Sequence, residues 1–284
     1  MAYIKYNGIF LKEFNNKETL DFIDAAGLNS DSNLNVDGLY TAEQLRMALE
    51  DLVQGHKNYG LWSKCIALFP YVAGTEQAST LNIKNINQNM TWNGTIIFDK
   101  DGISSNSSTA LDLNNYGTFS IAPMPTNNLT LVSYIGNKTP DNIGQNISRT
   151  VLSDTTYSVY NRLNIFRDTT LGISGNIGTT QTTSNFTSNG YKGFQSLTRT
   201  NNTQIRCWSN GRASAQSPIS TPIQSGYETT GNTFVVLNYN PQPSRLSLHF
   251  SGIYEGLTNT ELSILNFIIE QFERSIDRSP FLNI

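Results

Sequence analysis

"SLTRTNNTQIRCWSNGR", residues 196–212, gives a clear indication of the fold class of this chain. Asn201 and Asn202 are typical turn residues, and β-forming residues flank them on both sides. Side chains alternate between the two faces of a strand, so Cys207 and Trp208 are expected on opposite faces. The stretch therefore predicts a hairpin in an antiparallel sheet.

The same pattern continues outward from this hairpin, from about residue 71 to residue 257. Short apolar runs such as "GTIIFD", "LTLVSYIG", "TFVVLNY" and "RLSLHFSGIY" alternate with clusters of Asn, Gly, Ser, Thr and Pro. Closely spaced short strands of this kind are typical of an antiparallel sandwich or barrel. We therefore expect a mainly β domain.

One strongly apolar helix is predicted near the C-terminus, in "GLTNTELSILNFIIEQFERSIDR". Thr258 and Glu261 form a capping box at its start. A stripe of large apolar residues follows at spacings of three and four: Leu262, Leu265, Ile269, Phe272 and Ile276. Such a helix must lie on an apolar surface. Ile264 and Ile268 lie beside the stripe, and we expect them to contact the N-terminal helices or a neighbouring subunit.

The first sixteen residues predict a short extended or hairpin segment with a turn at Asn7-Gly8. Its aromatic residues are spaced by three and four, and they are Tyr3, Tyr6, Phe10 and Phe14. The segment has no core of its own, which makes it a candidate docking arm. The alternative is an arm that folds back on its own domain.

Residues 17–69 predict a helical block. One helix ends at Gly27, a second begins at the capping box of Thr41 and Gln44, and a third is expected in "YGLWSKCIALF" before Pro70. Between the first two helices, "NLNVDGLYTAEQ" places Asn33, Asn35 and Asp37 almost as in a calcium loop.

That loop lacks the carboxylates that calcium requires. Its first position is Asn33 rather than Asp, and its twelfth is Gln44 in place of a bidentate Glu. An Asn/Asp turn that leads into a capped helix explains the same residues. We therefore predict no metal and no cofactor.

Composition excludes several classes of partner. Only 14% of residues are charged and the net charge is −3, so a nucleic-acid partner is not expected. No apolar run reaches the length of about 18 residues that a membrane span needs, and no secretory signal is visible. Asn and Thr make up roughly a fifth of the chain, well above ordinary usage.

The two cysteines, Cys65 and Cys207, are predicted to be free thiols in a reducing compartment.

Motifs for catalysis are not found. The only histidines are His56 and His249, and neither lies in a recognisable nucleophile motif. Glycoside hydrolysis needs two facing carboxylates, and the few Asp and Glu residues of the β-region do not pair at strand or helix spacing.

Sugar binding without hydrolysis needs only flat aromatic rings and amide partners. Five aromatic residues are candidate platforms, with core packing or a subunit contact as the alternative: Trp92, Trp208, Tyr157, Tyr160 and Tyr191.

Three segments resemble parts of concanavalin-like (laminin-G-like) sandwich domains in virion proteins of tailed bacteriophages. They are the hairpin "GFQSLTRTNNTQIRCWSNGR", the ending "HFSGIYEGLTNTELSILNFIIEQFERSIDR" and the entry "YGLWSKCIALFPYVAGTEQASTLNIKN". The resemblance covers residues 58–278. The closing pair Asp277-Arg278 departs from the Gly-Arg pair of that group, and no binding residue is carried over.

This resemblance implies a fold and a role. The fold is a concanavalin-like jelly roll in residues 58–284, with residues 1–57 as an anchoring or oligomerisation segment. The implied role is a structural protein of a virion, as a head fibre, decoration protein or tail fibre. It would contact other virion proteins, form a homotrimer and attach to host surface polysaccharide. The alternatives are a stand-alone carbohydrate-binding module and a glycoside hydrolase.

Overall fold

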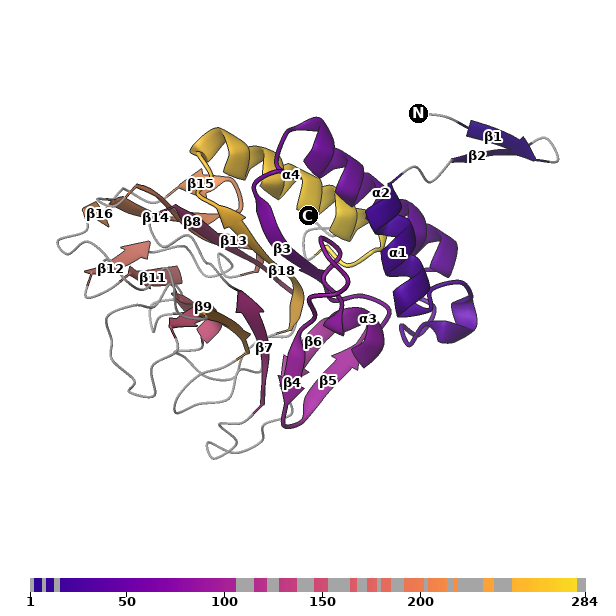
Figure 1. Cartoon of the computed structure of the whole chain (residues 1–284), viewed down its shortest axis with the longest axis horizontal. Helices are drawn as coiled ribbons and strands as arrows, with labels where there is room; N and C mark the ends of the chain where they lie inside the picture. Colours follow the sequence, from indigo (N-terminus) through magenta and orange to yellow (C-terminus); the bar gives the residue numbers. More distant parts are fainter. Residues whose placement is uncertain are drawn as a thin grey trace.

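The computed structural model describes most of the chain, and all statements below concern that part. The described residues are 3–6, 9–12, 16–105, 115–121, 128–136, 146–152, 164–167, 173–177, 180–184, 192–201, 204–213, 217–218, 232–237 and 247–279. They form two antiparallel sheets, a set of helices and a separate N-terminal hairpin (Figure 1). The predicted mainly β sandwich with N-terminal helices and one C-terminal helix is confirmed.

The larger sheet has nine strands, and the path through it runs β15-β14-β13-β8-β18-β6-β5. Strand β16 pairs with β14, and β3 pairs with β18. The bounds are β3 Cys65–Pro70, β5 Ile96–Asp99, β6 Gly102–Ser105, β8 Leu129–Ile135, β13 Gly193–Asn201, β14 Gln204–Ser209, β15 Arg212–Ala213, β16 Ser217–Pro218 and β18 Leu248–Glu255.

The smaller sheet has seven strands in the order β12-β11-β10-β9-β17-β7-β4. The bounds are β4 Thr91–Asn93, β7 Tyr116–Ile121, β9 Asn146–Leu152, β10 Asn164–Arg167, β11 Ile173–Ile177, β12 Thr180–Ser184 and β17 Asn232–Val236. A two-stranded sheet, β1 Tyr3–Tyr6 with β2 Ile9–Lys12, lies apart from both.

The helices are α1 Lys17–Ala26, α2 Ala42–Asn58, α3 Glu76–Thr80 and α4 Asn259–Ser275, with a short 3-10 helix at Asp31–Asn33. Gly27 ends α1 in the left-handed conformation (φ 69°), as predicted. Both predicted capping boxes are present, at Thr41 for α2 and at Thr258 for α4. None of the described helices has the length and apolar character needed to cross a membrane.

Strand alternation in the larger sheet creates two apolar faces. The inner face lies against the smaller sheet and includes Leu131 and Cys207, which pack in one core with Phe119 and Phe234. The outer face carries the residues next to them in sequence, such as Val132 and Trp208, which belong to a second core. The prediction that Cys207 and Trp208 lie on opposite faces is therefore confirmed.

Helices cover the outer face of the larger sheet. Figure 1 shows α2 and α4 side by side above β3 and β18. All five residues of the predicted stripe on α4 are buried: Leu262, Leu265, Ile269, Phe272 and Ile276. They pack in one core with residues of α1 and α2 and of the sheet. Residues 16–57 and the sandwich therefore share a hydrophobic core.

The third predicted helix is wrong. Residues 59–64 form turns, and Cys65–Pro70 is strand β3, which pairs with β18 from Phe250 to Tyr254. The apolar run "CIALF" lacks polar spacing, so its length and composition fit either a helix or a buried strand. Pairing with β18 and burial on both faces decide in favour of the strand.

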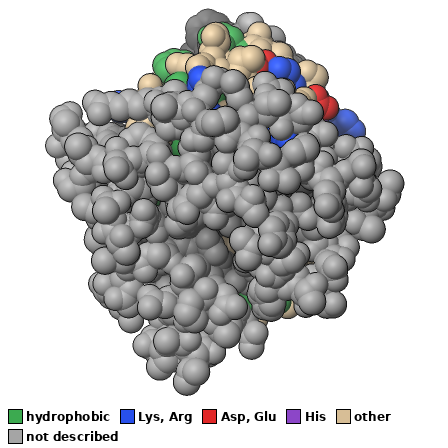
Figure 2. Space-filling view, turned by 90° about the vertical axis from the view of Figure 1, so that its left-hand side faces the viewer, with side chains coloured by type: hydrophobic (Ala, Val, Ile, Leu, Met, Phe, Trp, Pro, Cys, Tyr) green, Lys and Arg blue, Asp and Glu red, His purple; other side chains and the backbone are tan. Residues whose placement is uncertain are grey.

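Figure 2 shows one side of the molecule. Described side chains are visible chiefly along its upper rim, where hydrophobic, basic and acidic groups occur together.

Candidate functional site

Trp208, one of the predicted sugar platforms, is buried. Its side chain is only 5% exposed, and its ring meets the ring of Phe194 edge to face, with centroids 6.5 Å apart. Both rings belong to the core beneath the helices. Trp208 therefore offers no free ring face to a sugar in this structure, because its position on the outer face of the sheet is covered.

Trp92 lies at an edge of the sandwich and is half-buried. It stands on β4, the edge strand of the smaller sheet, opposite Gly117 of β7. A Cβ atom at Gly117 would lie 2.4 Å from Cζ3 of Trp92. Glycine at this position therefore allows the indole ring to lie close to the neighbouring strand.

Polar and aromatic contacts fix the orientation of this indole ring. Nε1 of Trp92 donates a hydrogen bond of 2.8 Å to Oγ1 of Thr80. The ring packs edge to face on Phe98, with centroids 5.3 Å apart, and on Tyr71 at 6.2 Å. Exposed Thr91 and half-buried Asn93 flank it in the strand. We call this region, Thr91–Asn93 with Phe98, the β4 corner.

A fixed, half-buried indole ring beside amide and hydroxyl groups suits the binding of a sugar. The apolar face of a pyranose can lie on the ring while Asn and Thr side chains bond to hydroxyl groups. Among the described residues, Trp92 is the predicted platform that meets this geometry. Tyr157, Tyr160 and Tyr191 lie outside the described residues.

The residues predicted for an interface divide into two groups. Tyr3, Tyr6 and Phe10 lie in the β1–β2 hairpin, and Phe14 lies outside the described residues. On α4, Ile268 is 6% exposed, and Ile264 is half-buried against the same core.

Helix α2 covers Ile268. A Cβ atom at Gly55 of α2 would lie 3.2 Å from Cγ2 of Ile268, so this side chain already packs on the chain's own helix. Contact with the N-terminal helices, one of the two expectations for Ile268, is therefore observed. Ile268 leaves no free surface for a second copy.

The loop that resembles a calcium site is held by internal hydrogen bonds. The amide of Asn33 donates to the carbonyl of Gly27, and the amide of Asn35 donates to the carbonyl of Gly74. Asp37 lies 3.5 Å from the ammonium of Lys100. These contacts fit the alternative of a turn that leads into α2. Within the described residues, no group of three or more His, Cys, Asp or Glu side chains is placed to hold a metal ion.

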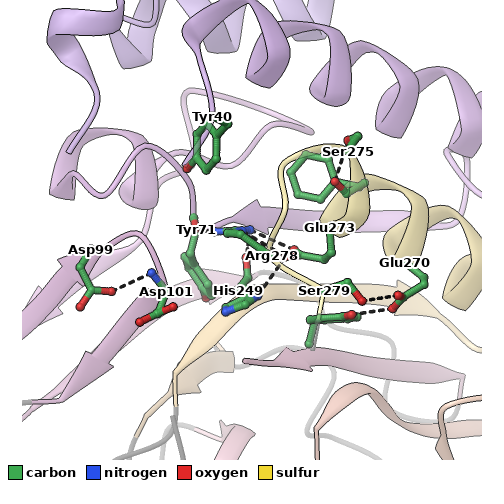
Figure 3. Close-up of polar contacts among 12 residues, drawn as sticks. Tyr40, Tyr71, Asp99, Asp101, His249, Glu270, Glu273, Ser275, Arg278 and Ser279 are labelled. Carbon is green, nitrogen blue, oxygen red and sulfur yellow. Dashed lines mark hydrogen bonds and ion pairs between the residues drawn. The ribbon is translucent and has the colours of Figure 1, made fainter. Parts of the chain in front are cut away.

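A buried charged cluster lies where α4 meets the sheet (Figure 3). Glu273 of α4 is fully buried and accepts hydrogen bonds from Nδ1 of His249 at 2.9 Å and from Nη2 of Arg278 at 2.9 Å. Arg278 also donates to the backbone carbonyl of Tyr71 at 2.6 Å. The end of α4 is thus tied to β18 and to the residue that follows β3. We call Glu273, Arg278 and His249 the C-terminal clamp.

Charges within the clamp compensate one another. Burial alone would raise the pKa of Glu273, but the charge of Arg278 and the contact with His249 outweigh it and hold this pKa below its usual value. Burial lowers the pKa of His249, although the carboxylate of Glu273 opposes this. The clamp therefore holds a carboxylate, a guanidinium and a neutral imidazole whose Nδ1–H donates to Glu273.

The His249–Glu273 pair resembles the orienting pair of a hydrolase, but its surroundings suit a structural role. A Cβ atom at Gly136 would lie 2.1 Å from Nε2 of His249, so the free edge of the imidazole packs against the backbone. His249 is 1% exposed and Glu273 is fully buried. A general base must reach a proton of the substrate, and the described residues leave this imidazole no access to one.

The sequence contained a signal for the clamp that composition alone does not reveal. Glu273 lies four residues after Ile269, on the same side of the helix as the apolar stripe. A carboxylate in that position must be buried, and a buried carboxylate needs a partner. Arg278 and His249 are those partners.

A second buried histidine joins α2 to the sheet. Nδ1 of His56 lies 2.7 Å from the carbonyl of Leu52, and Nε2 lies 2.9 Å from the hydroxyl of Tyr254 on β18. The imidazole and the phenol ring are stacked, with centroids 6.0 Å apart. Burial lowers the pKa of His56 to about 4, so the ring is neutral near pH 7. Its Nδ1–H donates to Leu52, and Nε2 accepts from Tyr254.

Comparison with solved structures identifies the fold. The chain matches the binding domain of botulinum neurotoxin serotype D with 10% sequence identity and a TM-score of 0.53, over 72% of this chain and 52% of that one. It matches the sialidase of Trypanosoma rangeli in complex with sialic acid with 11% identity and a TM-score of 0.56, over 80% of this chain and 39% of that one.

This chain thus spans about half of the toxin domain and less than half of the sialidase. At such low identity, the likeness shows the shared β-sandwich fold alone. No protein-family model matches the chain, and no curated protein matches its sequence.

Replacing Glu273 with Gln should destabilise the protein by about 3–5 kcal/mol, because Arg278 would then keep a buried charge without its counter-ion. Chemical denaturation at pH 7 measures this change. Glu43→Gln is the matched control, because Glu43 pairs with Arg46 at the surface and is 52% exposed; its effect should stay below about 1 kcal/mol. Equal effects of the two substitutions would contradict the clamp.

Acid should destabilise the fold as the pH falls from about 6.5 toward 4. The folded pKa of His56, about 4, lies below the unfolded value of about 6.5. The unfolded state therefore binds more protons in this range, and stability decreases as the pH falls, by at most about 3 kcal/mol for this residue. Denaturation midpoints at several pH values measure the slope. His56→Gln should flatten it, and a midpoint constant from pH 7 to pH 4.5 would contradict the burial of neutral histidines.

Proposed function

We propose that this chain is a glycan-binding domain that serves as an attachment component of a virion. The observation that carries the glycan-binding part is the β4 corner, where a half-buried and hydrogen-bonded Trp92 lies on the strand that ends the described part of the smaller sheet. The helices cover the outer face of the larger sheet, so ligands must approach the sandwich from another side.

The fold occurs both in binding domains and in enzymes. Its structural neighbours include the binding domain of a neurotoxin and a sialidase in complex with sialic acid. One neighbour is a binding domain and the other an enzyme, so the neighbours leave the choice between binding and cleavage open. We favour binding, because the one acid–base pair described above, His249 with Glu273, is buried and serves the fold.

The virion part of the proposal rests on the sequence. The three resembling segments, the uncharged Asn/Thr-rich composition and the aromatic arm at residues 1–16 are the features that favour it. A head fibre, a decoration protein and a tail fibre would each use such a domain at the particle surface, where it meets host polysaccharide. A carbohydrate-binding module that acts alone is the alternative, and a glycoside hydrolase is a further one.

Binding to a glycan array should identify a ligand, and Trp92→Ala should weaken binding to that ligand by about tenfold or more, because the ring supplies the stacking surface. Trp62→Ala is the control, since Trp62 is also half-buried but lies beside Lys57 and Lys84, next to the helices. Circular dichroism and thermal melting must show that both variants fold.

Three outcomes of this experiment would count against the proposal. If the unsubstituted chain binds no glycan, the glycan-binding part is wrong. If Trp92→Ala binds as tightly as the unsubstituted chain, the β4 corner is not the site. Release of reducing sugar from a bound polysaccharide would favour the hydrolase instead.

The virion part can be checked independently by mass spectrometry of purified phage particles from cells that express the chain. We expect the protein in the particles at a constant ratio to the major capsid protein. Its absence from intact particles would contradict a virion role and would leave glycan binding untouched.

A further inference from the structure

The two histidines of the chain both lie between the helices and a single strand, β18. Nε2 of His56, on α2, lies 2.9 Å from the hydroxyl of Tyr254 on β18. His249 belongs to β18 itself, and its Nδ1 lies 2.9 Å from the carboxylate of Glu273 on α4. Helices α2 and α4, which lie side by side over the sheet in Figure 1, are therefore each joined to β18 through an imidazole. We call these two helices the helical cover.

The larger sheet separates two cores that respond differently to acid. The outer core lies beneath the helical cover and includes Tyr254, which bonds to His56, and Tyr134, which stacks on His249. The inner core lies between the two sheets, and its titratable side chains are Tyr71 and Cys207. A phenol and a thiol are already uncharged at pH 7 and gain no charge in mild acid. Among the described residues, the buried imidazoles therefore belong to the outer core alone.

A proton on His56 would place a charge in a fully buried position. Nδ1 already bonds to the carbonyl of Leu52, so the proton would enter at Nε2, which accepts from Tyr254. Within the described residues, no carboxylate bonds to this imidazole, and the ammonium of Lys84 opposes a positive charge on it. Three other titratable groups lie around this contact: Cys65 near Tyr254, and the ion pair of Lys57 with Glu18 beside Trp62.

A proton on His249 would enter a cluster whose charges are already balanced. It would bind at Nε2, and a Cβ atom at Gly136 would lie 2.1 Å from this nitrogen and 2.4 Å from Oγ of Ser247. Glu273 and Asp101 favour a positive charge on the ring, but burial, which has the largest effect, and Arg278 oppose it. Figure 3 shows this region, whose further titratable groups are Tyr40, Tyr71, Tyr134 and Glu270.

We propose that the two histidine contacts form an acid-sensitive device: between about pH 6.5 and pH 4.5, the helical cover opens from the larger sheet while the inner core stays folded. Opening hydrates both imidazoles, so that they can take up protons. It also uncovers the aromatic side chains of the outer face, among them Trp208 and Phe250. The device is independent of glycan binding, because neither contact includes the β4 corner.

The size of the effect follows from His56. Its folded pKa of about 4 lies below the value of about 6.5 for a hydrated imidazole. The open state therefore binds more protons in this range, and the equilibrium constant for opening should rise about 50-fold between pH 7 and pH 4.5. The pKa of His249 is lowered in the same direction. Glu273, whose pKa lies below its usual value, stays ionised in this window.

Hydrogen exchange of the full chain, followed by mass spectrometry at pH 7 and pH 4.5, tests the proposal. Once the pH dependence of the exchange chemistry is corrected for, the protection of amides in α2 and α4 should fall by about 50-fold. The amides of β7 and β17 in the smaller sheet should keep their protection. The double variant His56→Gln with His249→Gln should lose this pH dependence, because an amide bonds but does not titrate. Glu43→Gln, on the exposed side of α2, should retain it.

Tryptophan fluorescence gives a second measurement. Trp208 belongs to the outer core, whereas Trp92 packs against the inner core. In a Trp62→Phe background, the variant that keeps Trp208 should show a red shift and stronger quenching by acrylamide at pH 4.5, and should recover at pH 7. The variant that keeps Trp92 should show neither change.

Three results would overturn the proposal. The first is equal protection of α2 and α4 at the two pH values. The second is a loss of protection that reaches β7 and β17 to the same extent, since this would be global unfolding. The third is an undiminished loss in the double glutamine variant. If that variant does not fold, the comparison of helices with strands in the unsubstituted chain still decides between selective opening and global unfolding.

Discussion

The outer face of the larger sheet must be buried, and the rest of the structure follows from that constraint. Its strands are apolar on both faces, and only one face can pack on the smaller sheet. Phe250, Tyr134 and Tyr254 on the other face would expose a large apolar area to water without a cover. Helices α2 and α4 supply this cover, and two histidine contacts join them to the sheet. The helices and the sandwich are therefore parts of one folding unit.

Much of this architecture could be predicted because its signals are local. The capping boxes at Thr41 and Thr258, the left-handed Gly27 and the alternation around Trp208 each depend on a few neighbouring residues. The helix expected at residues 59–69 was wrong because its apolar run has no polar spacing, and only the distant strand β18 decides its conformation. Local propensity cannot report a partner that lies almost two hundred residues away.

The candidate site was predictable only in its residue types. An indole in a strand can be a sugar platform or part of a core, and the sequence could not separate Trp92 from Trp208. The difference is positional: β4 is the last strand at its edge of the smaller sheet, whereas Trp208 lies under the helices. The buried clamp was missed for a related reason, because Glu273 and Arg278 look like ordinary polar residues of a surface helix until the helix is placed on the sheet.

The burial of all histidines and cysteines has a consequence for the surface. These are the side chains whose ordinary pKa values lie near neutrality, and the chain has two of each. His56, His249, Cys65 and Cys207 are all inside the protein. The exposed side chains therefore keep a nearly constant charge between mildly acidic and mildly alkaline conditions. A particle or cell that carried this domain would therefore present a surface of nearly the same charge across that range of pH, whereas the titrating imidazoles lie in the interior of the protein.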